Sequence, residues 1–237
     1  MAWETSGWQS ASASSEVNAA LVQESRRAFM SRVYGWMFAG LMVTGLVALF
    51  TVSNQQLLNV AVAWRIPLLL AELGLVFLLS LMAPRLSGPV AGLMFLAYSA
   101  LTGMTLSIYF LIYTAGSIGQ AFLLTAGVFG ALSLYGTLTK KDLSAWGSFL
   151  FMGLVGVVLA GLVNLFLRSD AMSFVVACAS VVVFAGLTAY DTQKLREMHA
   201  TTGYSSAASV SIVGALTLYL DFINLFLALL RLLGRRR

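Results

Sequence analysis

The chain has 237 residues, of which 59% are apolar and 10% charged, and its mean hydropathy is +0.89. A soluble domain carries about 25% charged residues, so this composition excludes a soluble enzyme and favours a lipid bilayer as the solvent. The net charge of +5 does not indicate nucleic-acid binding, because the basic residues stand at the ends of apolar runs rather than on a polar face.

Seven apolar runs follow one another along the chain, each long enough to cross about 30 Å of hydrocarbon. A polar segment rich in Ser and Ala precedes them and lacks the basic start and apolar stretch of a secretory signal. We therefore expect a mobile N-terminal tail over residues 1–25 and an all-α, seven-transmembrane-helix domain over residues 26–237. The seven runs cover residues 34–52, 66–83, 89–113, 118–138, 144–167, 171–190 and 210–230.

Lysine and arginine residues beside the runs predict which ends face the cytoplasm. With a cytoplasmic N-terminus, eight of them lie inside, and Arg65 and Arg168 lie on the far side. Seven full crossings also place the four arginines from Arg231 to Arg237 outside, which reduces the bias to eight against six. We expect a cytoplasmic N-terminus and a last segment that crosses fully.

Most other residues of note point to packing rather than to chemistry. Cys178 is the only cysteine, so it excludes an intrachain disulfide and a multi-thiolate metal site. The glycines within the runs, among them Gly127, Gly153 and Gly156, are expected to let helices approach closely. The sequence contains neither the paired histidines of a zinc protease nor a Gly-x-Ser-x-Gly elbow, so an enzyme is not expected.

Ionisable side chains inside apolar runs are the candidate functional residues, because they are costly in lipid unless they are paired or hydrated. Asp221 lies near the middle of the last run, and Asp191 ends the run before it. Glu72 lies six residues into the second run. Two plainer interpretations stay open: Asp191 as an interfacial acid paired with Lys194 on the same helix face, and Glu72 as a structural hydrogen-bonding acid.

Two carboxylates that meet in a low-dielectric bundle cannot both ionise cheaply, so Asp191 and Asp221 are expected to share a proton. When both are ionised, they supply hard oxygen ligands suited to calcium. Asn224 lies one helical turn after Asp221, so its amide shares that helix face. The residues therefore indicate a proton-sensitive cation site, provided that the two aspartates lie close together.

The segments around these residues resemble the Bax inhibitor-1 family, also called the transmembrane Bax inhibitor motif family. The resemblance covers about residues 26–234 and is strongest near the C-terminus. It is carried by residues 189–193 (AYDTQ), 218–226 (LYLDFINLF) and 229–231 (LLR), with support from Glu72 and from residues 140–143 (KKDL).

This resemblance implies a bundle with the last helix at its centre and six others around it, which acts as a pH-sensitive calcium leak channel. Asp191 and Asp221 match the family's proton-sharing aspartate pair, which senses pH and lines the ion path. Bacterial members use an arginine near the cytoplasmic end of the second span as a latch, and Arg85 is its nearest match here. Calcium is then a transported ion rather than a cofactor, and the other partners are protons and the lipid bilayer.

Two rival functions remain at this point. A proton/calcium exchanger could use the same carboxylates alternately, and a non-transporting regulator could bind membrane proteases or apoptotic proteins through the N-terminal tail. Short tails and the lack of an organelle signal favour a bacterial inner membrane.

Overall fold

The computed structural model describes residues 4–82, 85–198 and 207–237, with side chains over 24–82, 85–197 and 208–237. Seven helical stretches of this part are long and apolar enough to cross a membrane, which confirms the predicted number. The chain is an integral, multi-pass membrane protein. The helices are α1 (Glu4–Ser53), α2 (Gln55–Ala63), α3 (Arg65–Met82), α4 (Gly88–Leu106), α5 (Tyr109–Ile112), α6 (Ala115–Leu138), α7 (Ser144–Leu167), α8 (Asp170–Met198) and α9 (Ala207–Leu233).

The helix ends lie within a few residues of the predicted ones, except at four places, one of which is the run 89–113, where α4 ends at Leu106 and α5 begins at Tyr109. Residues 54–65 were expected to be a plain separator, but they contain α2, which Asn54 caps by accepting from the backbone N–H groups of Gln56 and Leu57. Helix α8 continues past Asp191 to Met198, as the helical propensity of that stretch predicts. Helix α1 begins at Glu4, so the mobile tail over residues 1–25 stays a prediction, because helical backbone does not measure motion.

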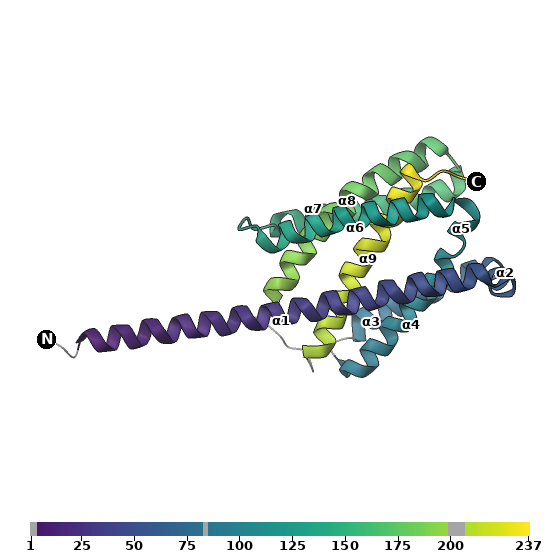
Figure 1. The fold of residues 1–237 in the computed structure, drawn as a ribbon. Helices are drawn as coiled ribbons and strands as arrows, with labels where there is room; N and C mark the ends of the chain where they lie inside the picture. The colour runs from purple at the N-terminus through teal and green to yellow at the C-terminus, as the bar shows by residue number, and fades with distance from the viewer. Residues whose placement is uncertain (1–3, 83–84, 199–206) are drawn as a thin grey trace.

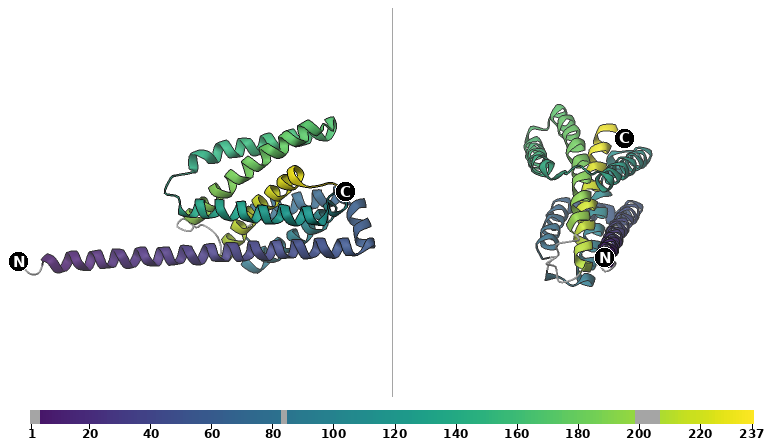
Figure 2. Two further views of the ribbon diagram at one scale, coloured as in Figure 1. Left: turned by 45° about the horizontal axis from the view of Figure 1, so that its top comes forward. Right: turned by 90° about the vertical axis from the view of Figure 1, so that its left-hand side faces the viewer.

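Helix α9 is the most buried of the seven spans, and it passes between α1 and α6 (Figure 1). It contacts α1, α4, α6 and α8. In its most apolar stretch 72% of the residues are buried, against 6% in the most apolar stretches of α3 and of α7. Helix α3 packs on α4, and α7 packs on α8 (Figure 2). That six helices surround a central α9 stays a prediction, since these two outer helices pack chiefly on α4 and α8 rather than on α9.

Close helix approach depends on glycines other than those singled out from the sequence. A Cβ atom on Gly136 of α6 would lie 2.3 Å from the carbonyl oxygen of Ala189 on α8. A Cβ on Gly156 or Gly127 would meet nothing within 4 Å, so the expectation of close packing is wrong for both. It holds for Gly153, where a Cβ would lie 2.9 Å from Val183. In lipid, an exposed glycine needs no partner, so its position in the sequence does not reveal which face packs.

Candidate functional site

The two predicted aspartates meet between neighbouring helices. Asp191 lies on α8 and Asp221 on α9, and their carboxyl groups lie close enough to act electrostatically on each other. Asp221 is 4% exposed, whereas Asp191 is only partly buried. Oδ2 of Asp221 has no hydrogen-bond partner of regular geometry in the described part of the chain. The α8–α9 interface therefore brings two acids together in a place where little water reaches the deeper one.

Asp191 is held in position by its neighbours on α8. The hydroxyl of Thr192 lies 3.1 Å from that of Ser133 on α6, which in turn lies 2.5 Å from the hydroxyl of Tyr34 on α1. On the other side, the ring of Tyr190 fills the space that a side chain at Gly147 of α7 would need. Direct contacts to α6 and α7, with α1 reached through Ser133, thus fix the segment that carries Asp191.

Gln193 ties the same segment to the loop between α6 and α7. Its Nε2 donates to the carbonyl oxygen of Lys141 at 2.8 Å, and its Oε1 accepts from the backbone N–H of Leu143 at 2.8 Å. In that loop, Asp142 Oδ1 accepts from the backbone N–H of Ser144, and hydrogen bonds from Ser144 lower the pKa of this exposed carboxyl below its ordinary value. Sequence reasoning from charge missed the positioning roles of Thr192 and Gln193.

Polar side chains close to Asp221 on α9 make hydrogen bonds of their own. Thr44 on α1 donates its single O–H to the carbonyl oxygen of Ser99 at 2.9 Å, so Tyr219 must be the donor in its 2.6 Å contact with the Thr44 hydroxyl. The Tyr219 ring also makes an edge contact with Phe95 at a centroid distance of 5.6 Å. Asn224, the predicted helper, donates Nδ2 to the carbonyl oxygen of Leu220 at 2.8 Å.

Two small cavities, each of about 200 Å³, lie along α9 on either side of the aspartates. The first is lined by Asp191, Lys194 and Thr217 among others, and the second by Asn224, Ser180 and Arg231 among others. Asp221 lines neither of them. Asp191 therefore borders the first space, and Asp221 lies on α9 between the stretches that line the two.

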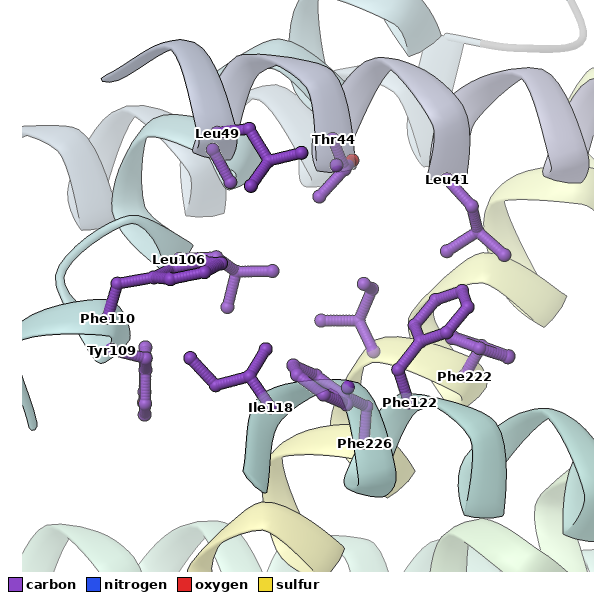
Figure 3. Close-up of a pocket in the computed structure, with 14 residues that line it drawn as sticks. Leu41, Thr44, Leu49, Leu106, Tyr109, Phe110, Ile118, Phe122, Phe222 and Phe226 are labelled. Atoms are coloured by element: carbon purple, nitrogen blue, oxygen red, sulfur yellow. The ribbon is translucent and has the colours of Figure 1, made fainter. Parts of the chain in front are cut away.

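A third cavity, of about 230 Å³, does not belong to this site (Figure 3). It opens between α1, α6 and α9, and its lining includes Leu41, Ile118, Phe122 and Phe226 but no charged residue. Such a space suits apolar groups and offers no ligand to an ion.

The remaining predicted residues lie away from the two aspartates. Glu72 accepts a hydrogen bond from the Thr105 hydroxyl, which agrees with the structural interpretation of this acid. Arg85 is exposed. The carbonyl oxygen of the next residue, Leu86, accepts a hydrogen bond from the Ser209 hydroxyl on α9. Ser209 precedes Asp221 by twelve positions, or about 18 Å of helix. No described contact joins Arg85 to the aspartates, so the latch stays a prediction. Lys194 acts electrostatically on Asp191, while its Nζ lies 5.6 Å from the centre of the Tyr190 ring.

Comparisons with known proteins point to one family over almost the whole chain. The family described as "Inhibitor of apoptosis-promoting Bax1" matches residues 26–237. The chain is 51% identical to the inner membrane protein YbhL of Escherichia coli over 215 residues, which is 88% of this chain and 92% of that protein. It is 50% identical to a Deinococcus radiodurans protein over 208 residues, covering 87% and 90% of the two chains. A Rickettsia prowazekii protein is 42% identical over 217 residues, covering 90% and 92%.

Proposed function

The chain belongs to the Bax inhibitor-1 family, and on that premise we propose that it is a calcium leak channel regulated by protons at Asp191 and Asp221. The observation that carries the proposal is the contact between the two carboxyl groups across α8 and α9. Two carboxyl groups this close together in an apolar bundle cannot both ionise cheaply, so we infer that they hold one proton between them. The pair then carries one negative charge in an apolar bundle, and it titrates as a unit.

The protonation state sets what the pair offers to a cation. With one proton bound, it presents a single charge and part of its oxygen ligands, and with two bound it presents no net charge. Calcium takes six to eight oxygen ligands, and the described residues contain no group of three or more acidic, histidine or cysteine side chains. The two aspartates therefore suit a passing ion that keeps several water molecules, as expected of a transported substrate.

The cavities on either side of the pair support a path along α9. Asp191 faces the first cavity and Asn224 the second, and the buried Asp221 separates them. A rearrangement of α8 against α9 that opens this contact would join the two spaces. This arrangement corresponds to a closed state, in which protonation biases the packing of the two helices.

We place the protein in a bacterial inner membrane with its N-terminus in the cytoplasm. The E. coli relative is named an inner membrane protein, and the positive residues between the spans favour this orientation. A latch would require the Arg85 side chain to move toward the aspartate pair. The residue after Arg85 contacts α9 at Ser209, about 18 Å of helix away from Asp221.

Calcium uptake into proteoliposomes, measured between pH 5.5 and 8.5, tests the proposal. We expect uptake to fall as the pH is lowered, by up to about tenfold per pH unit for a one-proton titration, because a second proton removes the charge of the pair. Asp191→Asn and Asp221→Asn should each flatten this profile. Glu197→Gln, an exposed acid six residues beyond Asp191 on α8, should leave it unchanged.

Three results would count against the proposal. An unaltered pH profile in both aspartate variants would remove the pair from the mechanism. Calcium accumulation against its gradient, driven by a proton gradient, would favour the exchanger. Absence of flux at every pH, with binding of a membrane protease or apoptotic protein that survives loss of both aspartates, would favour the regulator.

A further inference from the structure

A large cleft opens at the end of the bundle where α9 ends, with lining residues on α9, on the α7–α8 pair and on the α5 segment. It has a volume of about 980 Å³, and we call it the terminal cleft. Its lining combines two kinds of side chain, polar groups at helix ends and apolar groups on α7 and α8. The polar members are Asn164, Asp170, Ser173, Arg231 and Arg236.

The C-terminal backbone is fixed against the segment between α5 and α6, which places Arg236 at the cleft. The backbone N–H of Arg235 donates to the Ser117 hydroxyl at 3.0 Å, and the Arg235 carbonyl oxygen accepts from Thr114 at 3.2 Å. Arg236 forms an antiparallel bridge with Tyr113. At Gly234, a Cβ would lie 2.6 Å from the Tyr113 ring, so only glycine fits there without a shift.

The opposite wall of the terminal cleft is also ordered before any ligand binds. Asn164 Nδ2 donates to the Ser173 hydroxyl at 2.7 Å, and Asn164 Oδ1 accepts from the backbone N–H of Ser169 at 3.0 Å. These bonds fix the turn between α7 and α8, in which Arg168 has a left-handed backbone with φ of 51°. The cleft thus has two fixed walls, which limits the ordering cost of binding.

The charge of the terminal cleft favours an anion. Two arginines, Arg231 and Arg236, line it together with one acidic residue, Asp170. A guanidinium group presents planar pairs of N–H donors that match the oxygens of a phosphate, and it keeps its charge at any physiological pH. Arg236 lines neither cavity of the proposed ion path, whereas Arg231 also lines the second of them.

The surroundings of the cleft indicate a lipid rather than a soluble anion. Arg231 lies in the last turn of α9, and Asp170 in the first turn of α8, so both belong to helix ends, where headgroups lie. Apolar side chains at the cleft are widely exposed: Leu162 is 51% exposed, Leu165 69% and Phe174 62%. A molecule that fits both the basic and the apolar side chains of the cleft carries a phosphate group and acyl chains.

We propose that the terminal cleft binds the phosphate group of a membrane phospholipid, with Arg231 and Arg236 as its ligands. The acyl chains lie along the exposed apolar faces of α7 and α8. This inference does not rest on ion conduction, because lipid binding is measured without any flux.

Native mass spectrometry of the full chain in a neutral detergent tests the assignment. The probes are dioctanoyl phosphatidylglycerol, dioctanoylglycerol, which has the same chains and no phosphate, and inorganic phosphate. We expect one phosphatidylglycerol to bind, and binding to weaken roughly tenfold to hundredfold in Arg231→Gln and in Arg236→Gln. Arg237→Gln is the matched control, because it removes the same charge at the same end from a residue that does not line the cleft.

Arg231 and Arg236 are both exposed. Circular dichroism checks that the variants keep their helices. Equal phosphatidylglycerol binding by Arg231→Gln, Arg236→Gln and Arg237→Gln would overturn the proposal. Equal binding of dioctanoylglycerol would do the same, since the phosphate would then contribute nothing. Inorganic phosphate that binds as tightly as the lipid would overturn the assignment to a lipid.

Discussion

Helices α7 and α9 are both long and apolar, yet their positions in the bundle are opposite. Helix α7 contains the most apolar stretch of the seven spans, and only 6% of that stretch is buried. Helix α9 is less apolar, and 72% of its stretch is buried. In water the most apolar helix is expected to be the most buried, but lipid tails are as apolar as a protein interior, so apolarity does not select the inner helix.

Polar side chains mark the inner helices instead. Tyr219 on α9 and Thr192 on α8 make hydrogen bonds to side chains of other helices, and Asp221 on α9 interacts electrostatically with Asp191 on α8. Such groups are unfavourable toward hydrocarbon, so they must face protein or water.

The contrast between α7 and the α6–α8–α9 interface can be tested with the same substitution on each side. The single cysteine, Cys178, is partly buried, so its reaction with a thiol-reactive dye reports unfolding in detergent.

The largest contrast is expected at glycines. Gly136→Ala places a methyl group 2.3 Å from the backbone carbonyl oxygen of Ala189, and the two helices must separate. We expect a loss of about 3 kcal/mol in the free energy of unfolding. Gly156→Ala on α7 meets nothing within 4 Å and should be neutral or slightly stabilising, because alanine favours helix. Equal midpoints of thermal unfolding for the two variants would contradict close contact between α6 and α8.

A smaller contrast is expected for a deleted leucine side chain. Leu225 on α9 is fully buried, and Leu225→Ala leaves a cavity that its neighbours fill only in part. The transfer contribution is small in lipid, so we expect a loss of about 2 kcal/mol from packing alone. Leu159→Ala on α7, where the side chain is 56% exposed, should change the unfolding midpoint little, since lipid replaces the lost contacts. Similar losses of stability in both variants would mean that protein rather than lipid covers this face of α7.

The fold was largely predictable from the sequence because each span needs a long apolar run, and runs are visible without a structure. The seven predicted runs agree with the seven spans, and the breakers between them mark the turns. What the sequence lacks is the rotation of each helix about its axis. Gly156 and Gly136 look alike in sequence. Only the structure shows that Gly136 faces a neighbouring helix and that Gly156 does not.

The candidate site was predictable where charge marks it and not where geometry makes it. Asp221 stands out because an acid in mid-membrane needs a partner, and Asp191 is in contact with it. Gln193 carries no charge, and its role in clamping the loop at Lys141 depends on a contact across 52 positions. The latch role of Arg85 stays a prediction, since no described contact joins this exposed residue to the pair.

The smallest contrast is expected for a single hydroxyl group. Tyr219→Phe removes the donor to Thr44, while Thr44 keeps its own bond to the Ser99 carbonyl oxygen, so no donor is left unpaired. We expect a loss of about 1 kcal/mol, since hydrogen bonds between membrane helices average about 0.6 kcal/mol. Tyr135→Phe on the outer face of α6, where the side chain is 48% exposed, should have no measurable effect on the unfolding midpoint. A Tyr219→Phe protein as stable as the unaltered one would show that packing alone, including the ring contact with Phe95, holds this part of α9 in place.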